Sequence, residues 1–140
     1  MNNLGSLYHS MERYNEAEDL YLAALEISKI RVGENHPRTA RYLNNLALLY
    51  SLMCNYEVAE SLYLEALEIR TTQLGEHHVD TATSLNDLAT LYQRTGRYND
   101  SEALYIKALS IREICLGKQH LDTLASVNNL EKLKRITKSL

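Results

Sequence analysis

The sequence contains no tryptophan, no phenylalanine and a single proline, and it has only two cysteines, which lie far apart. Two distant thiols, Cys54 and Cys115, argue against a structural disulfide and favour a reducing compartment. No apolar run reaches the length of a membrane span, and residues 1–20 lack the apolar centre of a signal peptide. We therefore expect a cytoplasmic protein that does not enter a membrane.

Arrangements of residues that support catalysis are missing as well. The five glycines are not clustered, so no segment resembles the loops that cradle phosphate groups. His36, His78 and His120 recur at one fixed interval, which places them on successive loops rather than around one metal ion. Neither cysteine has a companion base within a recognisable motif. We expect no metal, no cofactor and no enzymatic activity.

The charge balance does not indicate a nucleic-acid partner. The chain has 15 Lys and Arg residues against 18 Asp and Glu, for a formal net charge of −3, and its basic excess is confined to residues 131–138. Binding of a phosphate backbone requires a basic stripe along one face. The composition is more typical of a protein that binds another protein.

A repeated segment organises what is present. Residues 43–50 read LNNLALLY, and the segment returns as MNNLGSLY at 1–8, LNDLATLY at 85–92 and VNNL at 127–130. Its central leucines are numbered 4, 46, 88 and 130, so the interval is 42 residues. A fixed period of this length predicts a stack of supersecondary units, none of which can bury its apolar face alone. Function is then expected on the surface of the stack.

Apolar residues spaced by three and four predict helices throughout. Asn15 and Asn99 each precede a glutamate by three residues and are expected to open helices as capping boxes, whereas His36 is expected to cap a helix that begins at Pro37. Gly33, Gly75 and Gly117 are expected to end helices. The predicted helices are 1–11, 15–32, 37–53, 57–74, 79–94, 99–116 and 121–138. Their short connections predict antiparallel neighbours.

Side chains at repeated sites indicate how these helices pack. Small Ala24, Ala66 and Ala108 would allow close approach of helices, with Tyr21, Tyr63 and Tyr105 filling the space beside them. The last copy places Glu131 and Lys134 where earlier copies have Ala47 and Tyr50 or their equivalents. A polar outer face of this kind predicts a terminal capping helix. The first copy lacks a lead-in before Met1, as expected of a fragment of a longer array or of a shortened end.

Together, the motif at residues 43–50, the segment Tyr56 to Ile69 and the pair Leu74-Gly75 resemble the tetratricopeptide repeat, and the 42-residue period resembles the kinesin light chain variety. The resemblance implies an all-α, right-handed solenoid of antiparallel helix pairs that fills one domain, residues 1–140. It implies repeats at 1–36, 37–78 and 79–120 and a capping helix at 121–138. Similar arrays occur in bacterial proteins without a kinesin motor, and no heptad region is present here.

The resemblance also implies that the first helix of each pair lines a concave groove that binds a peptide. Tandem asparagines recur on these helices, although folding does not require two amides in the middle of a helix. Amides can donate to and accept from an extended backbone. The predicted groove residues are Asn2, Asn3, Arg41, Asn44, Asn45, Leu48, Ser51, Leu52, Asn86, Asp87, Thr90, Arg94, Asn128 and Asn129. The alternative is that one amide of each pair bonds a neighbouring helix or its own backbone.

The residues that differ between copies indicate which partner would be selected. Leu48 and Leu52 form an apolar spot where the other copies are mostly polar, and the predicted surroundings are Arg41, Asn44, Asn45, Asn86 and Arg94. Such a site would take an apolar anchor beside acidic residues, which resembles the tryptophan-and-acid cargo motifs of kinesin light chains. Two other roles remain open: a structural spacer or self-associating segment of a longer scaffold, and a peptide-sensing regulator.

Overall fold

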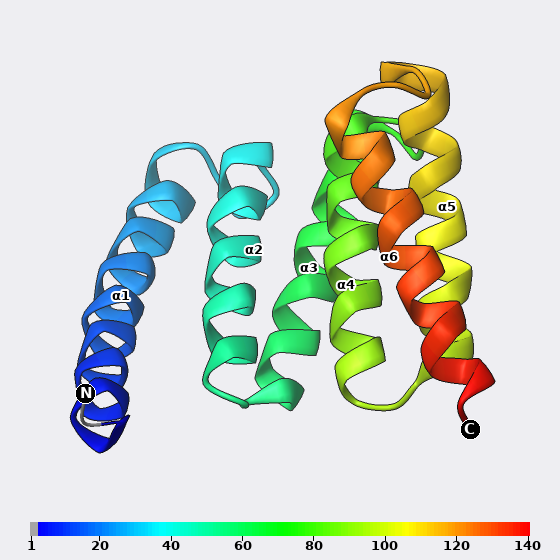
Figure 1. The fold of residues 1–140 in the computed structure, drawn as a ribbon. Helices are drawn as coiled ribbons and strands as arrows, with labels where there is room; N and C mark the ends of the chain where they lie inside the picture. The colour runs from blue at the N-terminus through cyan, green and yellow to red at the C-terminus, as the bar shows by residue number, and fades with distance from the viewer. Residues whose placement is uncertain (1–2) are drawn as a thin grey trace. The chain divides into compact units, whose positions relative to one another are not determined.

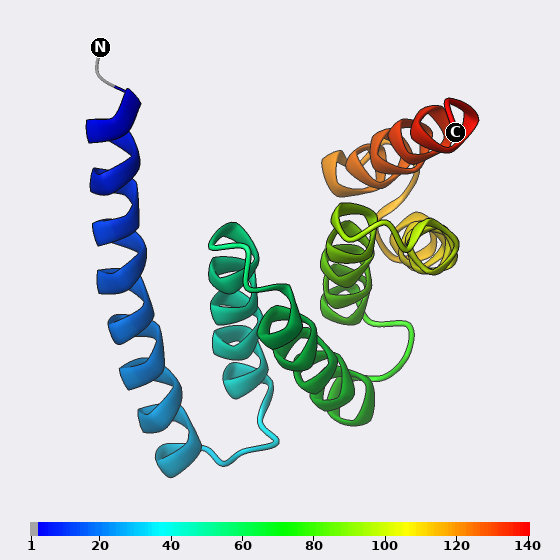
Figure 2. The ribbon, with the colours of Figure 1, turned by 90° about the horizontal axis from the view of Figure 1, so that it is seen from below.

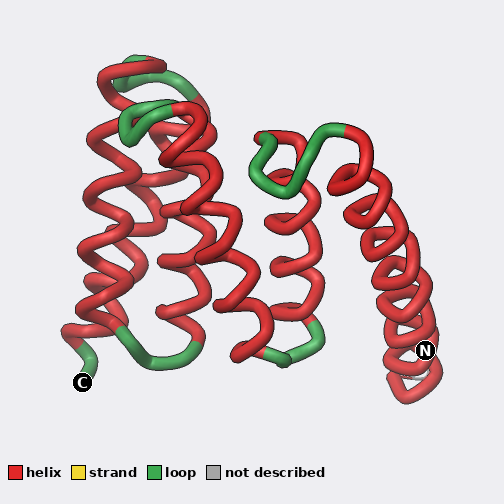
Figure 3. The backbone as a smooth tube through the Cα atoms, turned by 180° about the vertical axis from the view of Figure 1, so that it is seen from behind, coloured by secondary structure: helices red, strands yellow, loops and turns green. Residues whose placement is uncertain are grey.

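The computed structural model describes the backbone of residues 3–140 and the side chains of residues 13–140, and this part of the chain contains six helices and no strand (Figure 3). The helices are α1 (Asn3–Arg31), α2 (Pro37–Leu52), α3 (Tyr56–Leu74), α4 (Val79–Arg94), α5 (Tyr98–Leu116) and α6 (Leu121–Lys138). The prediction of an all-α chain without a β-sheet is confirmed for these residues. The five helices from α2 onwards lie within about two residues of their predicted bounds.

The predicted break before Asn15 is wrong, because α1 continues through it as a single helix. Cys54 and Gly96, at the end of α2 and just after α4, have positive φ angles of 64° and 83°. The first copy has Glu12 at the equivalent position, and no glycine or proline between Met11 and Asn15 interrupts the helix. An asparagine inside a helix costs only about 0.7 kcal/mol relative to alanine, which is too little to break it.

The capping box at Asn99 is also wrong. Helix α5 begins one residue earlier, and its N-cap is Arg97, which makes no capping hydrogen bond with its side chain. The Arg97 guanidinium instead lies 3.9 Å from the centre of the Tyr92 ring, and its Nε donates to Asp100 Oδ2 over 3.1 Å. A cation–π contact and an ion pair therefore fix this turn in place of the expected cap.

Histidines cap the starts of α2, α4 and α6. The Nδ1 atoms of His36, His78 and His120 accept hydrogen bonds of 3.0, 3.0 and 3.1 Å from the backbone N–H two residues further along. Each bond satisfies one of the N–H groups left unpaired at a helix start. The predicted cap at His36 with Pro37 in the first turn is confirmed. Gly75 and Gly117 directly follow α3 and α5 with φ angles of 105° and 90°, as predicted for helix ends.

Replacing Cys54 by glycine is expected to raise the free energy of unfolding by about 1 kcal/mol, because a left-handed backbone is strained for any residue with a Cβ atom. The change also removes the hydrogen bond of 3.6 Å that Tyr56 Oη donates to Cys54 Sγ, but this bond is exposed and weak. Urea denaturation measures the effect, and the reciprocal change Gly96→Cys should destabilise by a similar amount. A Cys54→Gly protein less stable than the wild type would contradict this account.

Two compact units make up the chain, residues 1–66 and 67–140, with the boundary inside α3, and each is described by itself. In the first unit α1 and α2 run antiparallel beside each other (Figure 2). Their contact buries Leu25 and Leu43, and a hydrogen bond of 2.8 Å joins the buried hydroxyls of Ser28 and Thr39. The Thr39 hydroxyl also donates to the Gly33 carbonyl over 2.7 Å, which ties the start of α2 to the end of α1.

In the second unit α5 packs against both α4 and α6, and α6 crosses in front of the other two helices in the view of Figure 1. One apolar cluster contains Ala82, Leu85, Ala108 and Ile111, and a second contains Ala89, Tyr105 and Leu133. Both Ala108 and Tyr105 are buried, as the repeated alanines and tyrosines predicted. On α6, Leu133 faces this core, whereas Glu131 and Lys134 are exposed, as expected of a capping helix.

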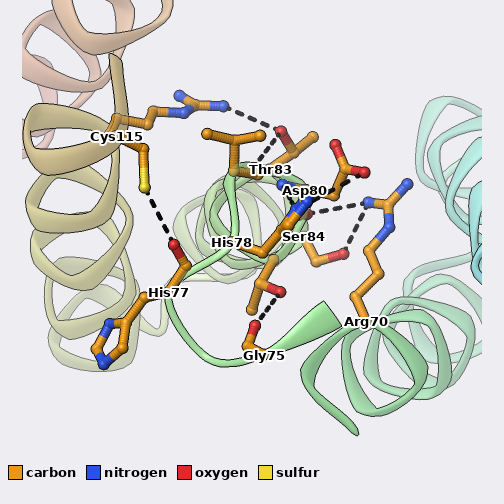
Figure 4. A network of polar contacts seen from close by, with 11 residues as sticks. Arg70, Gly75, His77, His78, Asp80, Thr83, Ser84 and Cys115 are labelled. Atoms are coloured by element: carbon orange, nitrogen blue, oxygen red, sulfur yellow. Dashed lines mark hydrogen bonds and ion pairs between the residues drawn. The ribbon is translucent and has the colours of Figure 1, made fainter. Parts of the chain in front are cut away.

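Buried arginines near the ends of α3 and α5 fasten these helices to the helices that follow, α4 and α6; Figure 4 shows the contact of Arg70 with Ser84. The Nη1 atom of Arg112 donates to Ser126 Oγ over 2.8 Å and to the Asp122 carbonyl over 3.2 Å. One repeat earlier, Arg70 makes the same two bonds to Ser84 Oγ and the Asp80 carbonyl, over 2.9 and 3.3 Å. Both arginines are 7% exposed, so their charges depend on these partners.

Candidate peptide-binding surface

Four predicted residues share one face of α2 in the first unit. Arg41, Asn45, Leu48 and Leu52 are spaced by four, three and four residues, which places their side chains in one row. Leu48 and Leu52 are 48% and 44% exposed, Arg41 is exposed and Asn45 is half-buried. We call this row the α2 surface. It combines an apolar pair, an amide and a positive charge within three turns of helix.

The polar groups of the α2 surface are not used by the fold. Among the described residues, the Asn45 side chain has no hydrogen-bond partner and Arg41 has no ion pair. The Arg41 guanidinium lies 5.6 Å from the centre of the neighbouring Tyr42 ring. An amide and a guanidinium left in this state can bond a partner without breaking any bond within the protein.

Asn44 and Ser51 lie beside this row on α2, along its buried edge, where they are 8% and 4% exposed. Helical geometry explains the difference, because Asn44 lies about 100° around the helix from Asn45. The surface that a partner can reach on α2 is therefore narrower than the sequence predicts. Asn2 lies outside the described residues, and Asn3 begins α1 but its side chain is not among those described.

A second predicted residue set lies in the second unit, on α4 and α6. The Asn129 amide donates to Asn86 Oδ1 over 3.4 Å, which links these two helices through the repeated asparagines. Asn128 is exposed, and Asp87 is half-buried. At Asn86 and Asn129 the structure therefore matches the alternative to peptide binding, in which an amide bonds a neighbouring helix.

Thr90 and Tyr105 form a partly buried polar contact between α4 and α5. Their hydroxyl oxygens are 2.8 Å apart, and Tyr105 Oη also donates to Gln93 Oε1 over 3.2 Å. Burial raises the pKa of Tyr105, and the nearby Asp87 carboxylate adds to that direction, whereas Thr90 and Arg94 oppose it. Thr90 thus serves the packing of α4 on α5, and exposed Arg94 at the end of α4 is the remaining charged candidate.

Tyr50 gives the first unit a dependence on alkaline pH. A hydrogen bond to the Glu18 carboxylate, together with burial, raises the pKa of Tyr50 from 10.0 to about 12. A raised pKa in the folded state contributes stability that is complete below pH 10 and is lost as the pH rises to 12. We expect the stability difference between wild type and Tyr50→Phe to shrink over this range in urea denaturation. A difference that stays constant from pH 8 to 12 would contradict the hydrogen bond.

Neither a cluster of metal-ligating side chains nor a helix able to span a membrane is found among the described residues. Among them, no three His, Cys, Asp or Glu side chains gather as they would around a metal ion. None of the helices in the described part has an apolar stretch that could cross a membrane.

Comparison with known families settles what kind of repeat this is. The tetratricopeptide repeat model matches residues 1–72, 52–113 and 80–138, so its matches span nearly the whole chain. The chain belongs to the tetratricopeptide repeat family. Tetratricopeptide repeats are generally scaffolds for protein–protein interaction and are typically not enzymes.

Solved tetratricopeptide repeat structures of the kinesin light chain kind resemble the chain. BtubC (BKLC) from P. vanneervenii matches with a TM-score of 0.82 and 28% identity, over 96% of this chain and 54% of that one. Kinesin light chain-like repeats from Podosopora anserina match with a TM-score of 0.79 and 23% identity, over 93% of this chain and 62% of that one. The second likeness shows the fold alone.

One curated relative shares a short segment with this tetratricopeptide repeat chain. It is a nucleotide-binding leucine-rich repeat (NLR)-like protein from Hyaloscypha variabilis, 44% identical over 39 residues. The match covers 28% of this chain and 4% of the relative. The chain spans about half the length of BtubC and a small part of the NLR-like protein, so the activities of those whole proteins are not carried over.

Proposed function

We propose that the α2 surface binds an extended segment of a protein partner, one that carries an apolar side chain beside acidic residues. The observation that carries this proposal is the row of Arg41, Asn45, Leu48 and Leu52, whose polar members make no hydrogen bond or ion pair with other described residues. Leu48 and Leu52 would take the apolar side chain, and Arg41 would attract a carboxylate. The Asn45 amide would donate a hydrogen bond to the partner's backbone and accept another from it.

Charge and amides in the second unit support the same class of partner independently. Exposed Arg94 on α4 and exposed Asn128 on α6 offer one positive charge and one amide to a bound segment. We assign Asn86 and Asn129 mainly to holding α4 and α6 together, because their amides bond each other. The role proposed for this tetratricopeptide repeat chain is that of a non-enzymatic adaptor in the cytoplasm, without a cofactor and without nucleic acid as its partner.

We also propose that the chain is one solenoid domain, with repeats at 1–36, 37–78 and 79–120 and a cap at 121–138. The histidine caps at the starts of α2, α4 and α6 support these boundaries, because each lies at or next to the junction of two proposed repeats.

Selection from a library of random peptides displayed on phage tests the proposed function. Wild-type protein should enrich peptides with a large apolar residue next to Asp or Glu, and a protein carrying Arg41→Glu should not enrich acidic ones. A Lys29→Glu protein serves as the control, because it makes the same charge change elsewhere in the first unit. Equal enrichment of acidic peptides by the wild type and the Arg41→Glu protein would refute the assignment of the α2 surface.

Self-association is a second candidate function, favoured by an apolar stripe on α1. Leu20, Ile27 and Ile30 are 71%, 53% and 76% exposed and are spaced by seven and three residues, so they share one face. A contiguous apolar face of this kind is typical of surfaces that another element or another copy covers. Light scattering across a range of concentrations would show a dimer that Ile27→Glu abolishes, whereas a monomer at all concentrations would exclude this candidate.

A further inference from the structure

A pocket in the second unit lies away from every residue that the sequence assigns to the groove. It is formed by the end of α3, the loop after it, the start of α4 and the middle of α5, with a volume of about 230 Å³. Leu67, Leu85 and Ile111 make its floor, and these side chains belong to one apolar cluster of the core. Thr81 of the pocket and Thr90 are nine residues apart, two and a half turns, so they lie on opposite sides of α4.

Charges of both signs stand at the rim of this pocket. Lys107 projects from α5 and Glu76 from the loop, and neither has a hydrogen bond or an ion pair among the described residues. The positions three and four residues from Lys107 hold no carboxylate that could neutralise it within α5. A bound carboxylate would therefore gain an ion pair at Lys107 without displacing another partner.

The wall of the pocket is held in place before any ligand arrives. Cys115 Sγ donates to the His77 carbonyl over 3.1 Å, which ties the loop to α5 (Figure 4). The Thr81 hydroxyl donates to the Gly75 carbonyl over 2.8 Å, which ties the loop to α4. A site already ordered in this way loses less entropy on binding than one that must form around its ligand.

The repeat itself does not require these residues. One repeat earlier, the positions of Lys107, Ser110 and Ile114 hold Glu65, Glu68 and Thr72, which are acidic or polar. In α5 the same face has become basic and apolar, and Ile114, one turn beyond the pocket residue Ile111, is 80% exposed. The equivalent residue of the first copy is Ile30, which is also exposed, and at Ile114 the isoleucine adds an apolar edge next to the pocket.

We propose that this pocket, together with Ile114 and Lys107, is a second docking site, for a protein segment that presents an aliphatic side chain followed by a carboxylate. The pocket volume of about 230 Å³ lies below the roughly 300–1,000 Å³ of pockets for whole small molecules and suits one inserted side chain. The aliphatic group extends the apolar cluster, and the carboxylate pairs with Lys107. This proposal does not depend on the α2 surface.

Methyl NMR of the full chain with short peptides tests the proposal. The probe is the acetylated and amidated tetrapeptide Gly-Leu-Asp-Gly; one control replaces Asp by Asn and another replaces Leu by Ser. We expect the probe to shift the methyl signals of Leu85 and Ile111, with the uncharged control binding about fivefold more weakly, as for loss of one exposed ion pair. The serine control should leave these signals unchanged.

Two substitutions that introduce the equivalent residues of the preceding repeat distinguish a loss of peptide binding from a loss of folding. Lys107→Glu and Ile114→Thr place at these sites the residues that α3 already carries, so both proteins should fold, with unchanged helical circular dichroism. Lys107→Glu should weaken the probe at least fivefold and Ile114→Thr about threefold. Absence of shifts at Leu85 and Ile111 would overturn the proposal. It would also be overturned if the Asp and Asn peptides bound the wild type equally, or if the Asp peptide bound the wild type and Lys107→Glu equally.

Discussion

Replacing Arg112 by alanine is expected to lower the free energy of unfolding by about 3 kcal/mol, the range of a lost hydrogen-bonded charge in a buried site. The change leaves Ser126 Oγ and the Asp122 carbonyl without the donor that now lies 2.8 and 3.2 Å away. It also removes the contact from Arg112 Nη2 to Thr83 Oγ1, over 3.5 Å, and the packing of the side-chain stem. Urea denaturation followed by circular dichroism measures the loss.

Two related variants show whether the hydrogen bonds cause this effect. Arg112→Lys should lose about half as much stability as Arg112→Ala, because a single ammonium cannot reproduce the fork of the guanidinium. Ser126→Ala should cost about 1 kcal/mol, since the guanidinium keeps its bond to the Asp122 carbonyl. A loss below about 1 kcal/mol for Arg112→Ala would mean that the arginine is a tolerated rather than a stabilising residue.

The double change Leu48→Ala and Leu52→Ala is expected to weaken a peptide selected by the wild-type protein about thirtyfold, with little change in stability. Each leucine already exposes nearly half of its surface, so folding buries little of what the change removes. A partner that covers the exposed surface of one leucine gains about 1 kcal/mol of binding free energy more than it gains from an alanine, which keeps the Cβ atom. Two such losses, about 2 kcal/mol, correspond to about thirtyfold weaker binding. Isothermal titration calorimetry measures the affinity.

Leu22→Ala is the control matched to the single change Leu52→Ala, because Leu22 on α1 is 43% exposed, nearly the same as Leu52. It removes the same atoms from the same unit but from another helix, so affinity for the selected peptide should not change. If Leu22→Ala weakens binding as much as Leu52→Ala alone does, the effect is general to the first unit and the α2 surface is not the binding site.

The 42-residue period was sufficient to predict the bounds of the five helices from α2 onwards, because the same local signals recur in each copy. The histidine at the start of α2 and the glycines after α3 and α5 act within one or two residues of the helix ends, where sequence patterns are most informative. The prediction failed at Asn15, where a favourable cap sequence competes with an uninterrupted helix. The first copy has Glu12 where Cys54 and Gly96 take positive φ angles after α2 and α4, and no glycine or proline nearby ends the helix.

The buried arginines were missed, although the sequence carries their signal. Arg70 and Arg112 are one repeat apart, and each is followed 14 residues later by a serine, Ser84 or Ser126. A repeated charge on a helix that is otherwise apolar on one side is a signal for a buried polar contact. It was obscured because arginine usually lies on the surface.

The candidate site depended on tertiary contacts that the sequence leaves open. Asn44 and Asn45 are adjacent and chemically identical, but one is buried and the other half-buried. The Asn86 amide was expected to face a partner or a helix, and in the structure it accepts from Asn129. Only the packing of neighbouring helices determines which amide of each pair is occupied, and this information is not local to the motif.

Asn45→Ala is the change that tests the central claim, binding of a partner by the α2 surface, most directly, with stability and affinity measured on the same protein. The account predicts an unchanged or slightly raised free energy of unfolding, because alanine is the better helix former and the Asn45 amide has no partner among the described residues. Affinity for the selected peptide should fall about fivefold, as for loss of one hydrogen bond. A loss of stability with unchanged affinity would contradict the account, because Asn45 would then hold helices together rather than bind a partner.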